Sequence, residues 1–545
     1  MAGLNTVPVT ATGATVRERA EGSGAQGKYV WALAAASALA VLIANLAGIA
    51  TGDDGVGYRA MAESLVAGNG YGYFLEDPVT VWPPIWPGLM AAVSWLTPLN
   101  ALGAAIVLNA AVSVGVVVVG HRLLRSVVTD ERLVLLGTVV FALGPSTIGL
   151  GHVLMTDMAF ALVVMTWMLV LMHFRRTGSW TALGLAALLA WAGFGLRYVG
   201  LVLIAFGGLW LLLDQRRSLV ERFRNGVLYG VVAASVPLAW MLRNHSIDGT
   251  FTGERNPSAR GFVDNCFDVA ATLGRFLLPG FGNGFTKIWA GVGIVALAVT
   301  VWATWKVLQH RPDGSARKDS PAAVLRRLWA AAGTPLGLLL LVPTLYMAYM
   351  LYVRTTTALN QLDLRLLYPA YFPLLVLGLA LVERTRRLEG TDDAGWWRLG
   401  WGAAHVWAVA NVAAGLVAMV AFAAGHPYFA GNYESDTFDD VRANVALEAL
   451  PEDCRVYSNL PNGLYPAVES LWSPQRRALE SSREIPDLEE ITATLDDTPS
   501  CLVWIDEPPF YGHLWPLEEL EDRLDLTLLD EQGNVAVFRM EARTD

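Results

Sequence analysis

The chain carries near its start an apolar segment long enough to cross a lipid bilayer. Tyr29 to Ala50 is a run of 22 residues without a charged side chain, which suits a helix through a hydrocarbon core of about 30 Å. The run is too long for the apolar region of a signal peptide and lacks a small-residue cleavage site, so we expect a retained helix. Composition agrees, because only 16% of the residues are charged, against about 25% in soluble proteins.

Comparable apolar stretches recur along the chain and predict a polytopic α-helical membrane protein. After 29–50 they lie at 84–99, 102–121, 133–150, 154–173, 180–196, 198–213, 226–242, 287–307, 335–353, 366–382 and 401–424. The stretch 84–99 begins at Pro83-Pro84, contains Pro87, and joins the next stretch through a short connection. We therefore interpret it as a juxtamembrane or re-entrant segment, which leaves about eleven transmembrane helices.

The distribution of basic residues predicts the orientation of these helices. With the N-terminus in the cytoplasm, the inner connections hold more than twice as many Lys and Arg residues as the outer ones. Cytoplasmic loops are normally the ones enriched in Lys and Arg. A full span at 84–99 would break this alternation at every later loop. We therefore expect a multi-pass protein of the plasma membrane with a cytoplasmic N-terminus and an extracytoplasmic C-terminus.

The chain divides into a polar N-terminus at 1–28, a membrane domain at 29–424 and an acidic soluble domain at 425–545. The last part holds 26 Asp and Glu against 8 Lys and Arg, which excludes the basic footprint of a nucleic-acid-binding domain. Strand-like segments at 455–459, 502–506 and 534–539 predict a small α/β fold. Cys454 and Cys501 each precede one of these strands. They form either a disulfide in an oxidising compartment or two free buried thiols.

Acidic residues mark the expected outer ends of two helices. Asp53 and Asp54 directly follow the first span, where low dielectric and mutual repulsion would raise the pKa of one of them and make it a usable base. The alternative is that one of the pair caps a short surface helix starting near Gly57. Asp157 opens a later helix, where it is either functional or a charge favoured by the helix dipole. His152 lies close to Asp157 in the sequence. Its simpler interpretation is a histidine at the membrane interface whose hydrogen bonds are satisfied by neighbouring groups.

Three arginines are expected on the same side of the membrane. Arg197, Arg243 and Arg365 lie at the predicted outer ends of their helices, and a guanidinium group can bind two phosphate oxygens at once. Each could instead anchor its helix to a lipid phosphate or to a neighbouring carboxylate. Acids and arginines on one face together suggest a lipid-linked phosphate substrate and a hydroxyl group to be deprotonated.

The first outer loop resembles that of GT-C-fold glycosyltransferases, in particular the protein O-mannosyltransferase and aminoarabinose transferase-like families. The likeness rests on an acidic pair followed by Tyr58, Ala62, Leu65, Gly68, Gly70-Tyr71, Pro83-Pro84 and Pro87. Later segments are similar to further signatures of this group, namely His152 with Thr156-Asp157, Arg197-Tyr198, Arg243-Asn244 and Arg365 with Tyr368-Pro369. The resemblance extends over about 50–385 and implies a GT-C-like fold.

The resemblance also implies a reaction and roles for individual residues. Such enzymes move a sugar from a polyprenyl-phosphate carrier to an acceptor, usually with inversion. Asp53 would be the base, supported by Asp54 or Asp157. Arg365, with Arg197 or Arg243, would hold the phosphate. The residues expected to contact substrate are Tyr58, His152, Trp82 and Tyr368.

Two points of the resemblance leave alternatives open. Relatives commonly have Asp-Glu where this chain has Asp53-Asp54, so either carboxylate could be the base. No cofactor is expected; the alternative is a divalent metal held by Asp53, Asp54 and Asp157, since some proteins of this fold need one. The expected partners are the polyprenyl-phosphate-linked sugar donor, the lipid bilayer and an acceptor that the sequence does not identify.

Two other classes of function fit a polytopic membrane protein. A transporter or flippase of lipid-linked substrates should carry charged or broken helices at mid-membrane and pseudo-symmetric halves. Here the charges gather at helix ends, and the sequence has no internal repeat. A non-catalytic membrane scaffold would tolerate replacement of Asp53.

Overall fold

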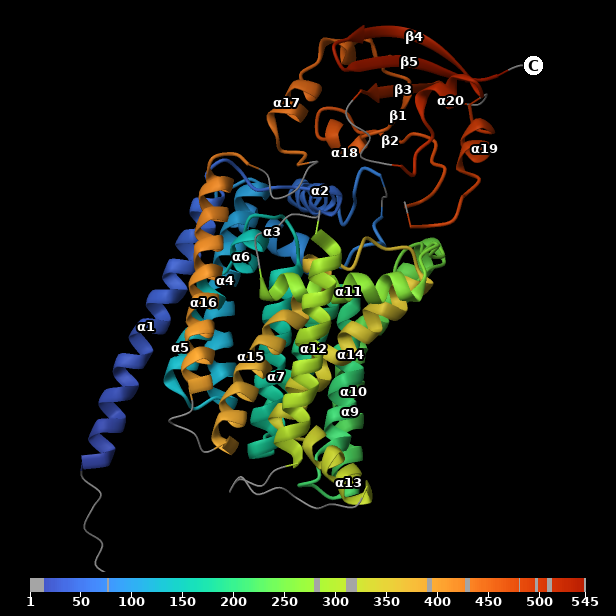
Figure 1. The fold of residues 1–545 in the computed structure, drawn as a ribbon. Helices are drawn as coiled ribbons and strands as arrows, with labels where there is room; N and C mark the ends of the chain where they lie inside the picture. Colours follow the sequence, from blue (N-terminus) through green and yellow to red (C-terminus); the bar gives the residue numbers. More distant parts are fainter. Residues whose placement is uncertain are drawn as a thin grey trace, which may run out of the picture.

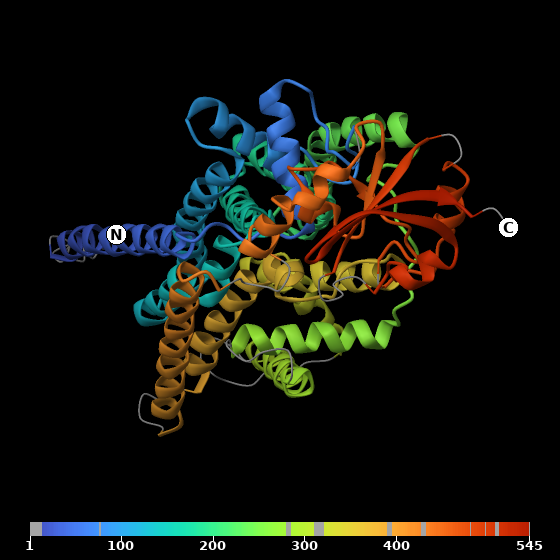
Figure 2. The same ribbon diagram turned by 90° about the horizontal axis from the view of Figure 1, so that it is seen from above.

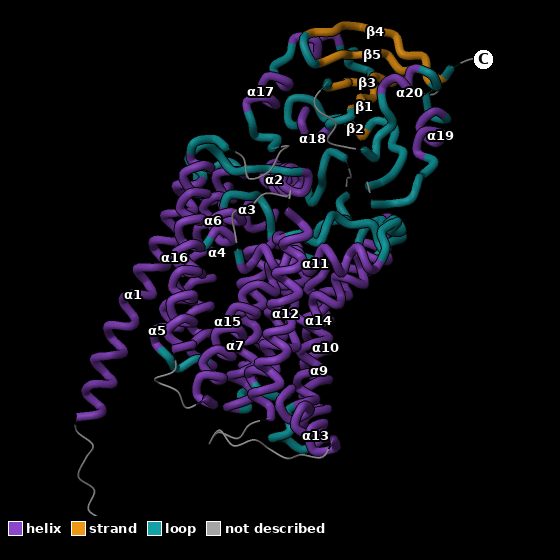
Figure 3. Tube along the Cα trace, viewed as in Figure 1, coloured by secondary structure: helices purple, strands orange, loops and turns teal. Residues whose placement is uncertain are grey.

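The computed structural model describes residues 14–75, 78–278, 285–309, 321–389, 395–426, 432–479, 481–495, 498–506 and 512–543. A bundle of long helices carries a small domain with a β-sheet at one end (Figure 1). Figure 3 shows that all strands belong to this C-terminal domain and that the rest of the described chain is helix and loop. We call the end of the bundle that bears the domain the domain end. Residues 1–13 of the predicted polar N-terminus lie outside the described part.

Every apolar stretch predicted from the sequence contains a helix, but the helix predicted over 29–50 ends at Ala44 and the one predicted over 154–173 begins at Asp157. The bundle helices are α1 (Ala14–Ala44), α3 (Ile85–Leu96), α4 (Ala101–Val127), α5 (Glu131–Leu143), α6 (Pro145–Gly151), α7 (Asp157–Thr177), α8 (Trp180–Leu196), α9 (Leu201–Leu213), α10 (Leu219–Asp248), α12 (Thr286–Gln309), α14 (Pro335–Thr356), α15 (Leu364–Glu389) and α16 (Gly395–Ala423). The chain is therefore a multi-pass, predominantly helical membrane protein, as predicted.

Length and composition separate these helices into two groups. Eight segments of the described chain are long and apolar enough to cross a membrane: Ala101–Val127, Glu131–Gly151, Asp157–Thr177, Leu219–Asp248, Thr286–Gln309, Pro335–Thr356, Leu364–Arg387 and Trp401–Ala423. Shorter apolar helices cover Tyr29–Ala44, Ile85–Leu96, Trp180–Leu196 and Tyr198–Leu213. The predicted count of eleven also included three of the shorter ones, those at 29–44, 180–196 and 198–213.

The segment interpreted as juxtamembrane forms the short helix α3. Its 12 residues extend about 18 Å, well below the thickness of a hydrocarbon core. It packs beside α2 (Asp53–Ala67) at the domain end (Figure 1). The prediction for 133–150 needs one correction, because Gly144 and Pro145 divide that stretch into α5 and α6. Proline has no N–H to continue the helical hydrogen bonds but suits the first position of a new helix.

Two amphipathic helices lie between the spans and were not predicted. These are α11 (Phe262–Leu277), between α10 and α12, and α13 (Pro321–Ala332), before α14. In Figure 1, α11 lies at the domain end and α13 at the opposite end. Because α11 carries charged residues such as Asp264, Asp268 and Arg275, it gives no long apolar run for a hydropathy argument to detect.

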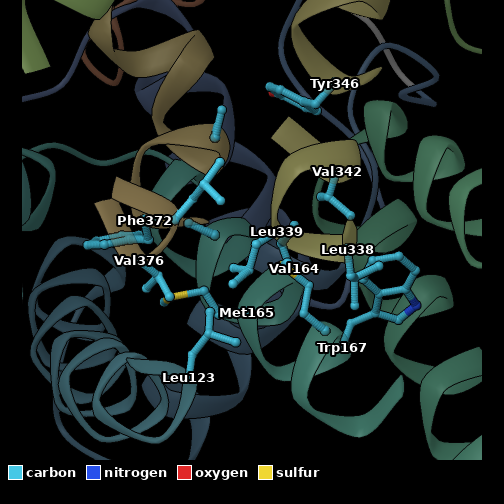
Figure 4. Close-up of a cluster of buried hydrophobic side chains, with 14 of the residues drawn as sticks. Leu123, Val164, Met165, Trp167, Leu338, Leu339, Val342, Tyr346, Phe372 and Val376 are labelled. Carbon is cyan, nitrogen blue, oxygen red and sulfur yellow. The ribbon is translucent and has the colours of Figure 1, made fainter. Parts of the chain in front are cut away.

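Side chains from four helices pack in the interior of the bundle. Figure 4 shows Leu123 from α4, Val164 and Trp167 from α7, Leu339 from α14 and Phe372 from α15 in one cluster. The buried Trp167 indole donates to the Tyr229 hydroxyl at 3.0 Å, and that hydroxyl donates to the Leu203 carbonyl at 2.8 Å. Large aromatic side chains with a polar group are tolerated inside when that group finds a partner, as it does here.

The C-terminal domain is built around a mixed five-stranded sheet with the order β2-β1-β3-β5-β4. Its elements are α17 (Asp436–Arg442), η3 (Val445–Ala449), β1 (Arg455–Ser458), α18 (Pro461–Leu464), β2 (Leu471–Trp472), α19 (Asp487–Thr492), β3 (Ser500–Ile505), α20 (Leu517–Glu521), β4 (Leu524–Gln532) and β5 (Val535–Ala542). The predicted strands correspond to β1, β3 and β5, which confirms the small α/β fold. Strands β2 and β4 were missed, since β2 has only two residues and most of β4 is exposed.

Strands β1 and β3 are parallel neighbours, with Val456 opposite Cys501. Cys454 and Cys501 form a disulfide, with Cα atoms 5.8 Å apart. Of the two alternatives left open by the sequence, the structure therefore has the disulfide. Figure 2, which looks onto the domain end, shows the sheet over one side of the bundle and α1 on the other.

Candidate active site

A cavity of about 1150 Å³ lies where the C-terminal domain meets the domain end of the bundle. Asp53, Asp54 and Trp82 line it from the bundle. Among the residues that line it from the C-terminal domain are Asn462 and Trp472. The cavity has the size range and the convergent polar groups of a small-molecule site.

The acidic pair opens helix α2. The helix begins at Asp53, and Gly52 occupies the N-cap position without a side-chain cap. Neither acid caps a helix near Gly57, so that alternative from the sequence is wrong. Both carboxylates lie in the first turn instead, where the helix dipole favours negative charge.

Asp53 is held by the C-terminal domain. Its Oδ1 accepts hydrogen bonds from the Tyr433 hydroxyl at 2.9 Å and from Asn462 Nδ2 at 2.7 Å. The Asn462 Oδ1 in turn accepts from the Tyr73 hydroxyl at 2.9 Å. Backbone contacts fix the same junction, since Thr51 O accepts from Tyr433 N at 3.0 Å. The orientation of Asp53 therefore depends on residues almost 400 positions away in the sequence.

Asp54 is held by the bundle. Arg365 Nη1 lies 3.1 Å from its Oδ2, and the Trp82 indole donates to its Oδ1 at 3.3 Å. Arg365 also contacts Met155 Sδ at 3.2 Å. The two acids thus differ in surroundings: a hydroxyl and an amide donate to Asp53, whereas a cation and an indole lie against Asp54.

Asp157 and Arg197 form an ion pair behind this site. The carboxylate is 1% exposed, and Arg197 Nη1 lies 2.6 Å from its Oδ1. The same guanidinium nitrogen donates to Thr156 Oγ1 at 3.3 Å. Neither residue is among those that line the cavity. A buried pair at this distance fixes the ends of α7 and α8 relative to each other.

Arg243 holds the segment that carries Trp82. Its Nη1 donates to the Val79 carbonyl and, at 3.0 Å, to Asn244 Oδ1. Its guanidinium also lies over the Trp240 ring, 4.8 Å from the ring centroid. The Tyr198 hydroxyl donates to the Thr80 carbonyl at 2.6 Å. Arg243 of α10 and Tyr198 therefore together fix the position of residues 79–82.

The four residues expected to contact substrate occupy different places. Trp82 lines the cavity. Tyr58 lies behind it, buried, with the two rings in a T-shaped contact at 6.2 Å. His152 is buried and stacks on Phe422 at 4.4 Å, as a structural histidine would. Tyr368 is buried in the bundle, with its hydroxyl 3.5 Å from Thr147 Oγ1.

Helix α2 makes a second polar contact with the C-terminal domain. Arg59 forms ion pairs with Glu63 at 2.9 Å and with Glu434 at 2.7 Å, and the Tyr465 hydroxyl donates to Glu63 Oε2 at 2.6 Å. Burial raises the pKa of Glu434 above its usual range, although nearby Arg59 acts in the opposite direction. These contacts and those of Asp53 hold the domain over the acidic pair.

The three acids proposed as metal ligands do not gather around one point. Asp157 pairs with Arg197, Asp54 with Arg365, and Asp53 faces Tyr433 and Asn462. Across the described residues, no group of three or more His, Cys, Asp or Glu side chains is placed to hold an ion. The arrangement of these three acids does not fit the metal alternative.

Sequence reasoning missed several residues of this site. Tyr433 and Asn462 lie in the acidic tail, which was interpreted only as an accessory domain. Arg354 and Gln361 line the cavity from α14 and the segment that follows it. No local pattern marks any of these residues, because their role comes from tertiary contacts.

Comparisons with known proteins identify the fold. No protein-family profile and no curated protein sequence matches the chain. Among solved structures, it resembles arabinofuranosyltransferase AftD from Mycobacteria, with 14% identity and a TM-score of 0.50, over 95% of this chain but only 42% of AftD. It also resembles ArnT from Cupriavidus metallidurans, with 16% identity and a TM-score of 0.48, over 94% of this chain and 98% of ArnT. The Archaeoglobus fulgidus oligosaccharyltransferase matches with 12% identity and a TM-score of 0.48, over 88% of this chain and 70% of that one.

AftD has the GT-C fold, and its likeness to this chain shows that the chain has a GT-C-like fold. At such low identity the likeness concerns the fold, and the same fold can support different activities. The chemistry must therefore be argued from the cavity and its residues.

Proposed function

We propose that this chain is a membrane glycosyltransferase that moves a sugar from a polyprenyl-phosphate carrier to an acceptor hydroxyl. The observation that carries the proposal is the acidic pair, Asp53 and Asp54, lining a cavity of about 1150 Å³ beside the half-buried Arg365. A carboxylate can accept the hydroxyl proton, and a nearby guanidinium can stabilise negative charge on a leaving phosphate. The GT-C-like fold supports the same conclusion.

The reaction follows from these groups. A carboxylate of the pair takes the proton from the acceptor hydroxyl while that oxygen attacks the anomeric carbon of the sugar. The bond between this carbon and the phosphate oxygen breaks, and the electron pair leaves with the carrier phosphate. Attack from the face opposite the leaving group inverts the configuration at the anomeric carbon. Positioning and electrostatic stabilisation supply most of the rate.

The surroundings of the two acids suggest different duties. Asp54 is engaged by Arg365 and Trp82, so it suits the part of a residue that orients the arginine and the indole. Asp53 accepts hydrogen bonds from two neutral donors of the C-terminal domain, Tyr433 and Asn462, and it lines the cavity. We assign the base to Asp53 and a supporting part to Asp54.

We place this site on the outer face of the plasma membrane. The connections at the opposite end of the bundle, which hold residues such as Arg125, Arg175 and Arg387, are the ones richer in Lys and Arg, as cytoplasmic connections are. The disulfide between Cys454 and Cys501 suits an oxidising compartment. Both features support an extracytoplasmic C-terminal domain.

Sugar transfer by the purified full-length protein tests the proposal. A panel of radiolabelled polyprenyl-phosphate sugars is offered to wild type, Asp53→Asn, Asp54→Asn and the matched exposed variant Asp525→Asn. Transfer or sugar release should fall by about 100-fold or more in Asp53→Asn and remain unchanged in Asp525→Asn. Equal turnover in all four proteins would remove the acidic pair from the mechanism, and loss only in Asp54→Asn would exchange the two assignments.

A further inference from the structure

Arg354 is a buried cation in the wall of the cavity. It lies in the last turn of α14, is 4% exposed, and lines the cavity from the side of the bundle. Its Nε and Nη1 atoms are buried without a hydrogen-bond partner among the described residues. A buried guanidinium without a partner is costly, because charged groups lose much of their hydration when they are removed from water.

The nearest charged groups leave this part of the wall with an excess of positive charge. Arg260 also lines the cavity, and its Nη2 lies 3.7 Å from Asp268 Oδ2. The other oxygen of Asp268 accepts from Gln361 Nε2 at 2.8 Å. Two guanidinium groups therefore share one carboxylate, which leaves one positive charge uncompensated.

Three of the four acidic residues that line the cavity are engaged by other groups, and the fourth is Glu254. Asp54 pairs with Arg365, and Asp248 accepts from Thr80 Oγ1 and from Thr250 N. Asp53 contacts Tyr433 and Asn462. Among the described residues, none of these four lining carboxylates forms an ion pair with Arg354 or Arg260.

Backbone hydrogen bonds hold the cationic region in place. Ala259 N donates to the Ser481 carbonyl at 2.7 Å, and Ala358 N donates to the Asn256 carbonyl at 2.8 Å. Ser481 Oγ donates to the Leu359 carbonyl at 3.0 Å. The segments that carry Arg260 and follow Arg354 are thus tied to each other and to the C-terminal domain, so the backbone near both arginines is fixed before a ligand enters. The Arg260 side chain itself is 44% exposed.

We propose that Arg354, together with Arg260, forms a phosphate-binding subsite in the cavity wall. The uncompensated charge matches a phosphodiester, which carries one negative charge, and guanidinium groups bind phosphate oxygens in pairs. Resting on the proposed function, the ligand is the phosphate that links the sugar to the polyprenyl carrier. Arg197 and Arg243 are engaged by protein groups, and Arg365 pairs with Asp54, so Arg354 and Arg260 would act on the phosphate in addition to Arg365.

Binding of three probes to the purified full-length protein tests this subsite. The probes are a polyprenyl phosphate, the corresponding polyprenol without phosphate, and inorganic phosphate, each titrated calorimetrically in the same detergent. Wild type is compared with Arg354→Gln, with the charge-conserving Arg354→Lys, and with Arg483→Gln, which removes an exposed arginine of the C-terminal domain. Gel filtration and thermal unfolding show which variants are folded.

If the subsite is correct, Arg354→Gln should weaken binding of the polyprenyl phosphate by about 10- to 100-fold. This is the loss of affinity expected when hydrogen bonds to a charged group are removed. Arg354→Lys should retain most of the affinity, Arg483→Gln all of it, and binding of the polyprenol should be equal in every protein. A loss for inorganic phosphate as well would show that the headgroup alone is recognised. Unchanged affinity of folded Arg354→Gln for the polyprenyl phosphate would overturn the subsite.

The proposed function can fail separately from this subsite. If wild type transfers sugar and Arg354→Gln has the same KM for the donor, the subsite is wrong and the transferase stands. If phosphate binding depends on Arg354 while no donor is turned over, the subsite stands and the transferase is wrong.

Discussion

At the scale of single residues, Asn462 connects the C-terminal domain to the acidic pair. Its amide donates to Asp53 and accepts from Tyr73. We expect Asn462→Ala to lower kcat by about tenfold or more, since one hydrogen bond to a charged group is lost, and to leave the KM for the donor nearly unchanged. Steady-state kinetics of sugar transfer measure both values.

Tyr73→Phe is the matched control for that substitution. It removes the hydrogen bond to Asn462 Oδ1 but keeps the bond from Asn462 to Asp53, so its effect on kcat should be much smaller. Equal losses in the two variants would show that the site depends on the whole junction rather than on the orientation of Asp53.

His513 predicts a pH dependence of the stability of the C-terminal domain. Burial lowers the pKa of His513 from the ordinary 6.5 to about 4. Between these two pH values the unfolded state binds a proton at His513 and the folded state does not. The contribution of His513 to the free energy of unfolding is therefore fully present above pH 6.5. As the pH falls toward 4, the free energy of unfolding decreases by up to about 3 kcal/mol. Thermal unfolding of full-length wild type and His513→Gln across this range measures the difference.

The variant should show a shallower loss of domain stability on acidification than wild type. Because the other titrating groups are common to both proteins, the comparison isolates His513. Parallel pH profiles for wild type and His513→Gln would contradict the assignment.

At the scale of elements, the segment 79–82 depends on α10. Arg243 was predicted from the sequence to bind phosphate, but the structure places its guanidinium on the Val79 carbonyl and the Trp240 ring. Arg243→Gln should therefore increase hydrogen exchange of residues 79–82 and lower kcat, while the affinity for a polyprenyl phosphate stays within about threefold of wild type. A loss of affinity as large as that of Arg354→Gln would restore the phosphate-binding role.

Features that depend on one continuous segment could be predicted from the sequence, whereas features that depend on contacts between distant segments could not. Long apolar helices were predicted well, because hydrophobicity over a span is a property of a single segment. Helix α11 was not, because charged and polar residues interrupt its apolar residues and leave no long apolar run. Asp53 and Asp54 could be singled out as carboxylates at a helix end. Among the described residues, Arg354 Nε and Nη1 find no hydrogen-bond partner, whereas Arg197 pairs with Asp157. This difference depends on packing between distant segments, which no local pattern records.

At the scale of the whole molecule, the site belongs to neither domain alone. The bundle supplies Asp53, Asp54 and Trp82, and the C-terminal domain supplies Asn462 and Trp472. Arg59, Glu63 and Glu434 join the two parts beside the cavity. Because about a third of the residues that line the cavity come from the C-terminal domain, we expect changes in this domain to alter which substrates the cavity accepts.

This shared site places the disulfide, the acidic pair and the proposed reaction on one side of the membrane. We expect Cys454 and Cys501 to be oxidised in cells and to react with a membrane-impermeant maleimide only after reduction from the outside. The measurement uses intact spheroplasts that express a Cys266→Ser chain, because Cys266 is a free cysteine. The control chain carries Cys454→Ser and Cys501→Ser in the same Cys266→Ser background and should not be labelled. Without the disulfide, its free energy of unfolding should be lower by about 2–4 kcal/mol. Labelling that requires permeabilised membranes would place the domain in the cytoplasm, where disulfides are rare and an outer-face transferase cannot operate.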